Sequence, residues 1–402
     1  MSINIKNKYM IQSILDTDLY KASTSFAYWK LYPLAEGTFT FYDRNNETYD
    51  ESFVEELRME FARAGMIKLT DKEFEFVKSK ILYIDLPYWE WLKTFRFEPE
   101  RIKISLTKDG KLRIEVTDRL YKVTWYEILV LYTVSELRNK NLGIKANIRD
   151  IIAKLDKKIN FANEHQLKFS EFGTRRRFSS LVQEEVISRL KERCPIYCTG
   201  TSNMYYAMKY DMTPIGTFPH EWIQAHAGMF GNKRANYLML EAWIKVYQGN
   251  LGTALTDLFG TKSFLRTLTR QQALLLQGYR IDSGDNFKVG NMIIERLEEF
   301  GIDPKTKLLV FSNALDFPKF RTIRDYFGNR IQVSAGIGTN LTCDPDIEGY
   351  KAANIVMKLS RVRMSAKDPW EKVVKISDDE GKQIGDPKEL EIARYELHLD
   401  EN

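Results

Sequence analysis

A chain of 402 residues with 44% hydrophobic and 29% charged residues has the balance of a folded protein, and it is too long for one ordinary compact domain. Its formal net charge of +5 is too weak to indicate nucleic-acid binding, but it agrees with a small anionic substrate. We therefore predict two structural units and exclude the disordered and nucleic-acid-binding classes.

The sequence carries no feature that predicts a membrane or secreted protein. No apolar run approaches the roughly 20 residues that cross a bilayer, and the N-terminus lacks the apolar core of a signal peptide. The three cysteines, Cys194, Cys198 and Cys343, are too few for a structural zinc site. We expect a cytoplasmic protein with reduced thiols.

The first 140 residues are predicted to form a mixed α and β unit. Apolar spacing there predicts a strand at 36–44, a helix at 51–64, a hairpin at 101–116 and a helix at 119–140. The hairpin is indicated by two alternating runs that flank Asp109-Gly110, a turn sequence. The apolar run at 125–137 contains Glu127 and Glu136 and predicts a buried helix.

From about residue 165 onward, short β-prone segments recur, each followed by a polar or glycine-rich loop and a helical stretch. These segments lie at 168–176, 195–203, 213–222, 247–257, 279–287, 308–316 and 331–340. Their spacing is that of βα units, which form a parallel sheet. We predict an α/β fold in which 141–349 form a partial (β/α) barrel, with the active site at the strand ends. Residues 350–402 contain one more strand and are expected to pack on the N-terminal unit.

The segment SAGIGTN at 334–340 ends a predicted strand with two glycines and a hydroxyl. Gly336 and Gly338 would let backbone N–H groups approach a phosphate, and Thr339 would add a donor. The same pattern also fits a simple tight turn.

The segment RIDSGDN at 280–286 places Arg280, Asp282 and Asp285 at another strand end. They could form a structural ion pair that caps the next helix. Alternatively, they could hold a metal-bound pyrophosphate and stabilise a cationic transition state.

Among the four histidines, His220 has the most suggestive position. It follows a predicted strand and Pro219, and it begins a predicted helix. An imidazole there could act as a nucleophile or transfer a proton, with Glu221 as its orienting partner. His226 is interpreted as a structural helix residue.

Two further segments have both a structural and a functional interpretation. EFGTRRR at 171–177 fits a solvated basic run, or a site where Phe172 stacks on a flat ring and Arg175 binds a phosphate. Taken alone, DTDLYKAS at 16–23 is a capped helix N-terminus.

Together these segments resemble the nicotinate phosphoribosyltransferase family. The landmarks occur in the family's order, as TDLYK (17–21), EFGTRR (171–176), GTSN (200–203), GTFPHEW (216–222), RIDSGD (280–285) and SAGIGTN (334–340). The resemblance covers the chain from residue 16 to about 340 and implies the fold of type II phosphoribosyltransferases.

The resemblance implies that nicotinate reacts with phosphoribosyl pyrophosphate to give nicotinate mononucleotide and pyrophosphate, with ATP hydrolysis coupled through phosphorylation of His220. It implies catalytic roles for His220 and Asp282. It implies that nicotinate is bound by Tyr20, Phe172, Thr217 and Arg280. It implies that phosphoribosyl pyrophosphate is bound by Arg175, Ser283, Gly336, Gly338 and Thr339.

The implied cofactor is Mg²⁺ carried by the pyrophosphate or by ATP, with no protein residue assigned as a metal ligand. In the family, Asp18 and Tyr20 reach the site of a neighbouring subunit, which implies a homodimer with shared active sites. Neither nucleic acid nor a membrane is implied as a partner.

The choice of base depends on one position. Nicotinamide-using relatives carry an acidic residue after the Gly-Thr pair, where this chain has Ser202, so a carboxylate is not repelled and nicotinate is favoured. The alternatives are a nicotinamide phosphoribosyltransferase and a non-catalytic phosphate-binding barrel. A barrel aldolase or isomerase is disfavoured, because no strand-end segment offers a clear Schiff-base lysine or glutamate base.

Overall fold

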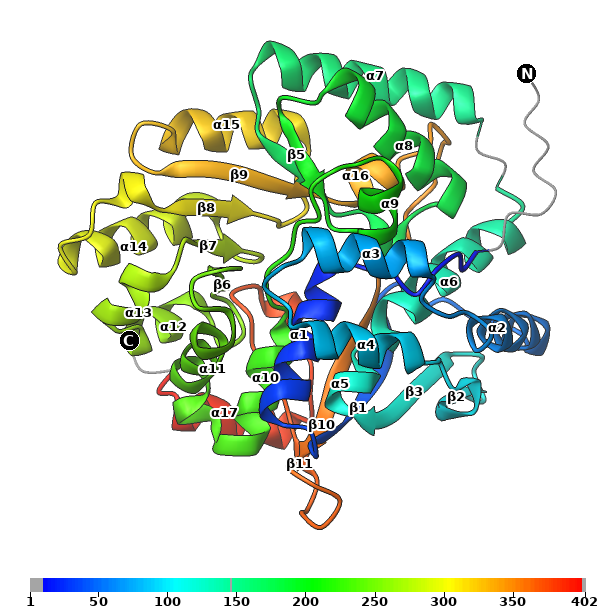
Figure 1. Ribbon diagram of the computed structural model, residues 1–402, viewed down its shortest axis with the longest axis horizontal. Helices are drawn as coiled ribbons and strands as arrows, with labels where there is room; N and C mark the ends of the chain where they lie inside the picture. The colour runs from blue at the N-terminus through cyan, green and yellow to red at the C-terminus, as the bar shows by residue number, and fades with distance from the viewer. Residues whose placement is uncertain (1–9, 145–146, 400–402) are drawn as a thin grey trace.

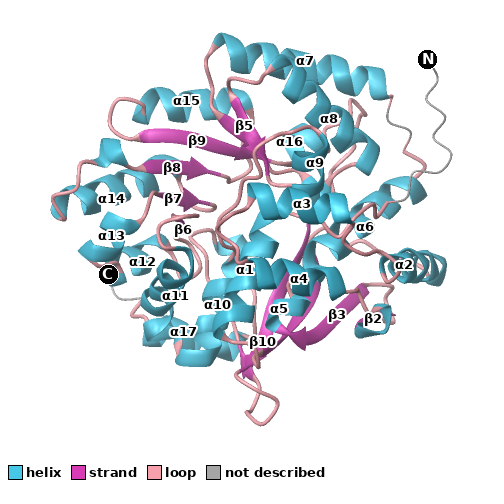
Figure 2. Cartoon of the chain, in the orientation of Figure 1, coloured by secondary structure: helices cyan, strands magenta, loops and turns pink. Residues whose placement is uncertain are grey.

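The computed structural model describes residues 10–144 and 147–399 (Figure 1). The first nine residues of the predicted N-terminal unit, residues 145–146 and the last three residues of the tail lie outside the described part. Two sheets lie in different parts of the molecule, and helices surround both of them (Figure 2).

The smaller sheet is antiparallel and combines both ends of the chain. Its order is β11-β10-β1-β3-β2, with β1 Glu36–Asp43, β2 Ile102–Leu106, β3 Leu112–Arg119, β10 Ile355–Arg363 and β11 Glu371–Lys372. Strand β1 pairs along its whole length with β10, from Glu36 opposite Arg363 to Asp43 opposite Ile355. The predicted hairpin is confirmed, and Gly110 in its turn has a φ of 74°, which favours glycine.

The larger sheet is parallel throughout, as the repeated βα segments predict. Its order is β5-β4-β9-β8-β7-β6, with β4 Phe169–Glu171, β5 Cys198–Thr201, β6 Thr253–Leu255, β7 Gly278–Ile281, β8 Leu308–Phe311 and β9 Gln332–Ile337. Among the described residues, the edge strands β5 and β6 do not pair with each other, so the sheet stays open. The predicted α/β class with a partial barrel is confirmed, and the barrel is not closed.

The strand predicted within 213–222 is wrong. This segment makes only a single parallel bridge, between Pro214 and Thr201. Pro214 and Pro219 have no N–H group to donate to a ladder. Gly216 packs against the start of the first helix, where an added Cβ would lie 3.0 Å from the Cβ of Leu19. The segment therefore follows this helix instead of extending the sheet.

The helices cover both sheets (Figure 1). They are α1 Leu19–Leu31, α2 Glu51–Ala64, α3 Asp71–Lys80, α4 Leu86–Thr94, α5 Leu120–Val123, α6 Tyr126–Asn141, α7 Ile148–Glu164, α8 Ser180–Arg193, α9 Met204–Lys209, α10 His220–Phe230, α11 Asn232–Tyr247, α12 Thr261–Thr267, α13 Arg270–Leu275, α14 Asn286–Glu299, α15 Phe317–Phe327, α16 Thr339–Thr342 and α17 Pro387–Glu396. Short 3₁₀ turns lie at Pro99–Arg101, Thr174–Arg176, Pro304–Thr306 and Glu380–Lys382. The predicted helix at 119–140 is divided into α5 and α6, and α6 is buried around its circumference.

A buried ion-pair network holds the start of α1 against the parallel sheet. The guanidinium of Arg177 is fully buried and contacts the carboxylates of Asp16, at 2.8 Å, and Glu136, at 2.6 Å. Asn203, after β5, also donates to Asp16 at 2.8 Å. Removing one member of such a network would leave a buried charge without compensation, so the network fixes where α1 begins.

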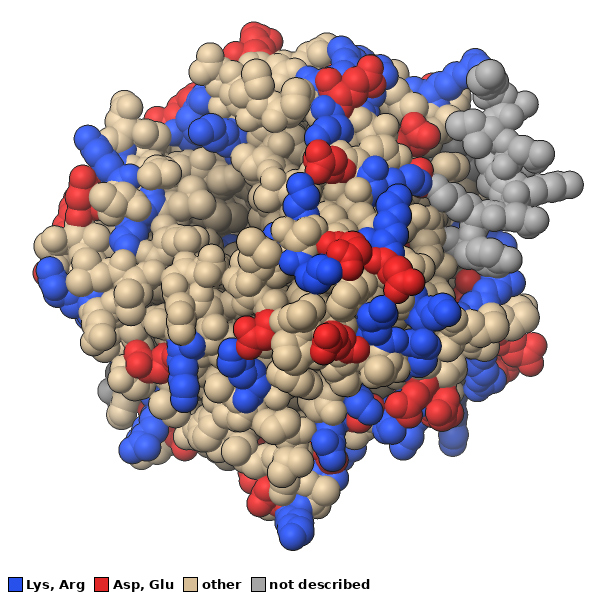
Figure 3. All heavy atoms as spheres, viewed as in Figure 1, with Lys and Arg blue, Asp and Glu red and all other residues tan. Residues whose placement is uncertain are grey.

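The described part of the chain contains no helix that is both long and apolar enough to span a bilayer. On the face shown in Figure 3, lysines and arginines alternate with acidic residues. This view shows no large basic patch of the kind that binds a nucleic acid.

Candidate active site

A cavity of about 570 Å³ lies at the carboxyl ends of the parallel strands. The structure brings nearly all predicted site residues to its wall, namely Tyr20, Phe172, Arg175, Thr217, His220, Arg280, Asp282, Gly336, Gly338 and Thr339. Ser202, which we linked to the choice of base, also lines it. Residues far apart in the sequence therefore form one site, at the edge where parallel sheets carry their active sites.

Ser283 is the predicted binding residue that does not reach the cavity wall. Its side chain is fully buried, and its hydroxyl donates to the Asp257 carboxylate at 2.5 Å. It also accepts from the backbone N–H of Asp378 at 3.3 Å. Ser283 thus supports the residues behind the cavity, because the turn after β7 directs Asp282 toward the cavity and the next side chain away from it.

The N-terminal motif joins the cavity of its own chain. The Leu19 N–H donates to the Ser202 carbonyl at 2.7 Å, and the Ser202 hydroxyl donates to Asp18 at 2.7 Å. These contacts place Asp18 and Tyr20 in the same cavity as His220. The predicted homodimer, in which these two residues reach a neighbouring subunit's site, stays a prediction.

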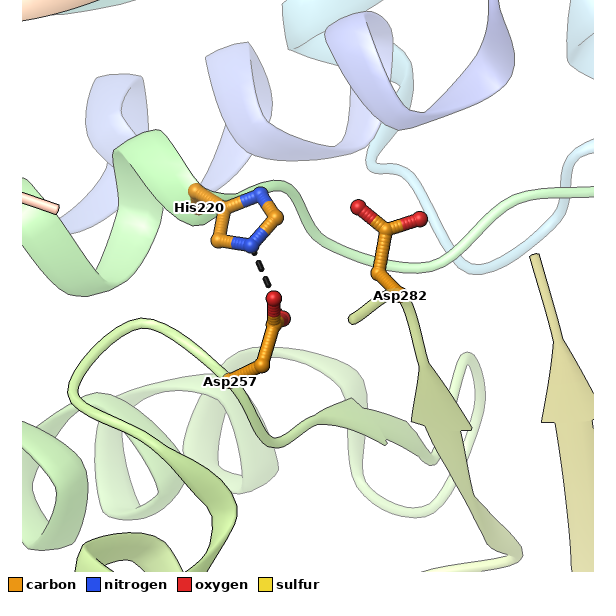
Figure 4. A group of neighbouring side chains, drawn as sticks. All are labelled: His220, Asp257 and Asp282. Atoms are coloured by element: carbon orange, nitrogen blue, oxygen red, sulfur yellow. Dashed lines mark hydrogen bonds and ion pairs between the residues drawn. The ribbon is translucent and has the colours of Figure 1, made fainter. Parts of the chain in front are cut away.

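His220 begins α10 and is held by two residues that the sequence did not identify. Its Nε2 lies 2.8 Å from the Asp257 carboxylate, in the loop after β6, and 2.8 Å from the Lys375 ammonium (Figure 4). The other ring nitrogen, Nδ1, makes no hydrogen bond with the described residues, and His220 lines the cavity. Burial lowers the pKa of His220 to about 4, although Asp257 opposes the shift. The ring is therefore neutral near pH 7 and can act as a nucleophile.

Asp257, and not Glu221, is the orienting partner of His220. Glu221 turns away to a buried cluster, in which Lys21 and Thr124 both donate to its carboxylate. Burial alone would raise the pKa of Asp257, but the neighbouring His220, which donates a hydrogen bond to it, and the ammonium of Lys375 hold it well below the ordinary value. Asp257 therefore stays ionised and can accept the hydrogen bond from the Nε2–H group. His226 is structural, as expected, because its Nδ1 contacts the Trp222 carbonyl at 2.7 Å.

Asp282 directly follows β7 and directs its carboxylate into the space beside His220 (Figure 4). It accepts a hydrogen bond of 2.6 Å from the Ser312 hydroxyl. Burial would raise its pKa, but the neighbouring Arg280 lowers it below the usual value, so the group is ionised. Asp285 instead caps α14 by accepting from the Lys288 N–H at 2.7 Å. In this segment Asp285 therefore has the structural role, as a helix cap, and Asp282 is the carboxylate available for chemistry.

Arg280 and Phe172 define another part of the wall. Arg280 donates to the Thr217 hydroxyl at 3.2 Å, and its buried Nε has no protein partner. A Cβ added at Gly336 would lie 2.3 Å from the Phe172 ring. Glycine at position 336 therefore leaves room for the Phe172 ring. The sequence had suggested only that Gly336 allows close approach to a phosphate.

Three arginines gather with no acidic partner of their own. Arg44 follows β1, and Arg175 and Arg176 lie in the 3₁₀ turn after β4; all three line the cavity. Among the residues that the structure describes, their guanidinium groups have no hydrogen-bond or ion-pair partner. Burial and the charge of Arg175 lower the pKa of Arg176 to about 10, and the group stays charged at neutral pH. Such a cluster is suited to a multivalent anion.

The antiparallel sheet and the tail contribute further cations. Lys358 on β10, Lys375 and Lys382 all line the cavity, so its wall carries seven Lys or Arg side chains and four Asp or Glu side chains. Burial lowers the pKa of Lys358 to about 8, although Glu127 opposes this. These lysines were not predicted, because the tail has no family landmark after residue 340. The only available signal was the amphipathic strand pattern at 355–363.

The position of Asp282 fits a divalent cation brought by a substrate. Donor atoms of His220, Asp257 and Asp282 lie within 4.8 Å of one another. The oxygens of Asp257 are already engaged by His220, Ser283 and Lys375. Asp282 has one carboxylate oxygen bound by Ser312, and its other oxygen has no donor in the part of the chain that the structure describes. Mg²⁺ typically needs one or two protein carboxylates and takes its other ligands from phosphates and water, so Asp282 fits this role.

A partial α/β barrel with a cationic cavity at its strand ends is the architecture of an enzyme for small phosphorylated molecules. Residues 15–135 match the model of the nicotinate phosphoribosyltransferase (NAPRTase) N-terminal domain, and residues 167–401 match that of the nicotinate phosphoribosyltransferase (NAPRTase) family. The chain belongs to the nicotinate phosphoribosyltransferase family.

Individual relatives agree with this membership. The nicotinate phosphoribosyltransferase of Methanococcoides burtonii is 37% identical over 402 residues, which cover 96% of this chain and 97% of the relative. That of Photorhabdus laumondii is 37% identical, with 95% and 94% of the two chains covered. The crystal structure of nicotinate phosphoribosyltransferase from Porphyromonas gingivalis is 41% identical, covers 96% of this chain and all of its own, and superposes with a TM-score of 0.95. The Vibrio cholerae structure is 30% identical, covers 98% and 94%, and has a TM-score of 0.91.

Proposed function

We propose that this protein joins nicotinate to phosphoribosyl pyrophosphate, forming nicotinate mononucleotide and pyrophosphate in cytoplasmic NAD salvage. The observation that supports this most strongly is the arrangement of one cavity within one chain. It combines an aromatic wall, an ionised aspartate and an arginine whose buried Nε has no partner among the described residues. It also holds a group of arginines that have no acidic partner among these residues.

The reaction forms a bond between the pyridine nitrogen of nicotinate and the anomeric carbon of the ribose. The bond from that carbon to the pyrophosphate oxygen breaks, and the leaving pyrophosphate keeps the electron pair. Positive charge develops on the ribose, as in glycoside chemistry, and the ionised Asp282 carboxylate would stabilise it. Bound Mg²⁺ would neutralise charge on the leaving group. Arg44, Arg175 and Arg176 would hold the phosphates.

ATP hydrolysis would be coupled to this reaction through His220. The free Nδ1 attacks the γ-phosphorus, an N–P bond forms, and the bond to the bridging oxygen breaks so that ADP leaves with the electron pair. The Nε2 proton stays on the ring and is held by Asp257. Attack by water on the phosphorus later releases phosphate and restores the neutral ring.

Nicotinate is favoured over nicotinamide by Arg280. Its unpaired buried Nε can donate to a carboxylate, which forms a stronger, charge-assisted bond than an amide does. Ser202 alone is a weaker argument than the sequence suggested, because Asp18 lies 2.7 Å from its hydroxyl. Burial raises the pKa of Asp18, which reduces the repulsion of a substrate carboxylate.

The activity is tested by supplying the protein with phosphoribosyl pyrophosphate, Mg²⁺ and either base, with and without ATP. We expect nicotinate mononucleotide and pyrophosphate to appear in equal amounts, and ATP to accelerate their formation. If no pyrophosphate is released with either base, the result would support a non-catalytic phosphate-binding protein instead.

Replacing Arg280 with alanine is expected to weaken nicotinate binding by about 10- to 100-fold, because a charge-assisted hydrogen bond is lost. Nicotinamide binding should change much less. Calorimetric titration of both bases into the wild type and the variant would measure the difference. Equal nicotinate affinity in the two proteins would remove Arg280 from the base site.

Replacing Gly336 with alanine separates two roles for this glycine. The new Cβ would displace the Phe172 ring, so we expect the KM for nicotinate to rise about tenfold through lost stacking. If Gly336 instead serves close approach to phosphate, the KM for phosphoribosyl pyrophosphate will rise. Steady-state kinetics with each substrate varied in turn distinguishes the two.

A further inference from the structure

Backbone hydrogen bonds of the C-terminal tail place Lys375 next to His220. After β11, the backbone N–H groups of Ile376 and Ser377 donate to the Leu258 carbonyl, at 2.9 and 3.1 Å. Lys375 and Ile384 exchange two backbone hydrogen bonds, at 2.8 and 2.9 Å. The backbone at Lys375 is thus held against the loop after β6, which also carries Asp257. Its side chain is 6% exposed and reaches the cavity wall.

The ammonium of Lys375 is only partly satisfied by its neighbours. Its Nζ lies 2.8 Å from His220 Nε2 and 3.3 Å from Asp257 Oδ2. One ring nitrogen cannot donate to Asp257 and accept from Lys375 at the same time. Because Asp257 is ionised, Nε2 keeps its proton and offers no lone pair to the lysine. The remaining contact, at 3.3 Å, is longer than the usual 2.7–2.9 Å of a charge-assisted bond.

We propose that Lys375 is a positioning residue that holds the phosphoryl group transferred from a nucleoside triphosphate to His220. This inference rests on the proposed phosphorylation of His220. A phosphoryl group brings close to two negative charges into a site that already holds the Asp257 and Asp282 carboxylates. Lys375 supplies a cation beside the Nε2 edge of the ring. Because its four-carbon stem is flexible, the ammonium can turn from Nε2 toward the oxygens of a phosphoryl group on Nδ1, which give it the acceptor that it lacks.

The other cavity lysines are less suited to this task. Lys382 donates to the Asp282 carbonyl at 3.1 Å, to Asn313 at 2.8 Å and to Asp379 at 2.8 Å, so its three donors are engaged. The ammonium of Lys358 faces Glu127 at 3.9 Å, and in the described part of the chain it makes no hydrogen bond with the ring of His220. Lys375 is the cavity lysine whose charge is directed at the imidazole.

The test compares Lys375→Met, Lys375→Gln and Lys375→Arg with the wild type. Lys372→Met is the matched control, because Lys372 lies three residues earlier, is 57% exposed and pairs with Asp386 away from the cavity. Each protein is incubated with γ-³²P-labelled ATP and Mg²⁺, and label on the protein is measured. The ratio of ATP hydrolysed to nicotinate mononucleotide formed is measured separately, and circular dichroism checks the fold.

We expect label in the methionine and glutamine variants to fall by about 10- to 100-fold, because a charge-assisted contact to the phosphoryl group is lost. The arginine variant should recover much of the label, since a positive charge returns, and Lys372→Met should behave as the wild type. Wild-type label in a folded methionine or glutamine variant, or no recovery with arginine, would overturn the proposal for Lys375. A wild type that forms no labelled protein but makes product would overturn the phosphohistidine, while the phosphoribosyl transfer itself would stand.

Discussion

Replacing His220 with asparagine is expected to abolish the phosphorylated enzyme and to separate product formation from ATP hydrolysis. Asparagine is a polar side chain that fits within the space of the histidine, but it offers no nucleophilic nitrogen. We expect the ATP-stimulated kcat/KM for nicotinate to fall by about 100-fold or more. The slower reaction without ATP should remain measurable, and the ratio of ATP hydrolysed to product should approach zero.

The matched control is His226→Asn. His226 lies in the same helix, but its ring contacts the Trp222 carbonyl and does not line the cavity. This variant should lose stability, because a packed buried ring is removed, yet keep the ratio of ATP hydrolysed to product. If His220→Asn still hydrolyses ATP in step with product, the role of His220 as phosphoryl acceptor is wrong.

Replacing Asp282 with asparagine is expected to lower kcat for nucleotide formation by about 100- to 1,000-fold, the usual cost of removing one group that stabilises developing charge. The substitution keeps the size of the side chain and its bond from Ser312 but removes the ionised carboxylate. The effect should appear with and without ATP, unlike that of His220→Asn. Single-turnover kinetics would separate the chemical step from substrate binding.

Asp285 provides the matched control three residues later. Its side chain caps α14 and does not line the cavity. We expect Asp285→Asn to change kcat little and to alter stability by less than about 1 kcal/mol, since asparagine is also a good helix cap. Equal losses of activity in the two variants would indicate a general disturbance of the loop and contradict a specific role for Asp282.

Local sequence patterns predicted most of the fold. Alternation over 36–44, the turn at Asp109-Gly110 and the helical spacing at 51–64 correspond to β1, the β2–β3 hairpin and α2. Six of the seven predicted βα segments contain a strand of the parallel sheet. The seventh, at 213–222, failed because two prolines and contact with α1 prevent a ladder. That contact is tertiary, so no local pattern indicated it.

The site was predictable where a residue lies in a strand-end motif. Phe172, Arg280 and Asp282 all line the cavity for this reason, whereas Tyr20 lies in α1 and was predicted from the family resemblance alone. Ser283 shares the motif of Asp282 but points behind the wall, a difference that depends on the turn geometry.

The partners of His220 could not be predicted in the same way. Asp257 lies 37 residues and Lys375 lies 155 residues further along the chain, in segments without a recognisable motif. Arg44 and Lys358 come from the antiparallel sheet, whose pairing of β1 with β10 brings both ends of the chain to the cavity. Long-range pairing of this kind leaves no mark in local periodicity.

The central claim is that this cavity selects nicotinate as the base that reacts with phosphoribosyl pyrophosphate. The most direct test is a competition in which both bases are present with phosphoribosyl pyrophosphate, Mg²⁺ and ATP, and the two mononucleotides are separated and measured. Because only nicotinate offers a carboxylate to Arg280, we predict that its kcat/KM exceeds that of nicotinamide by about 100-fold. Equal or faster formation of nicotinamide mononucleotide would contradict the account.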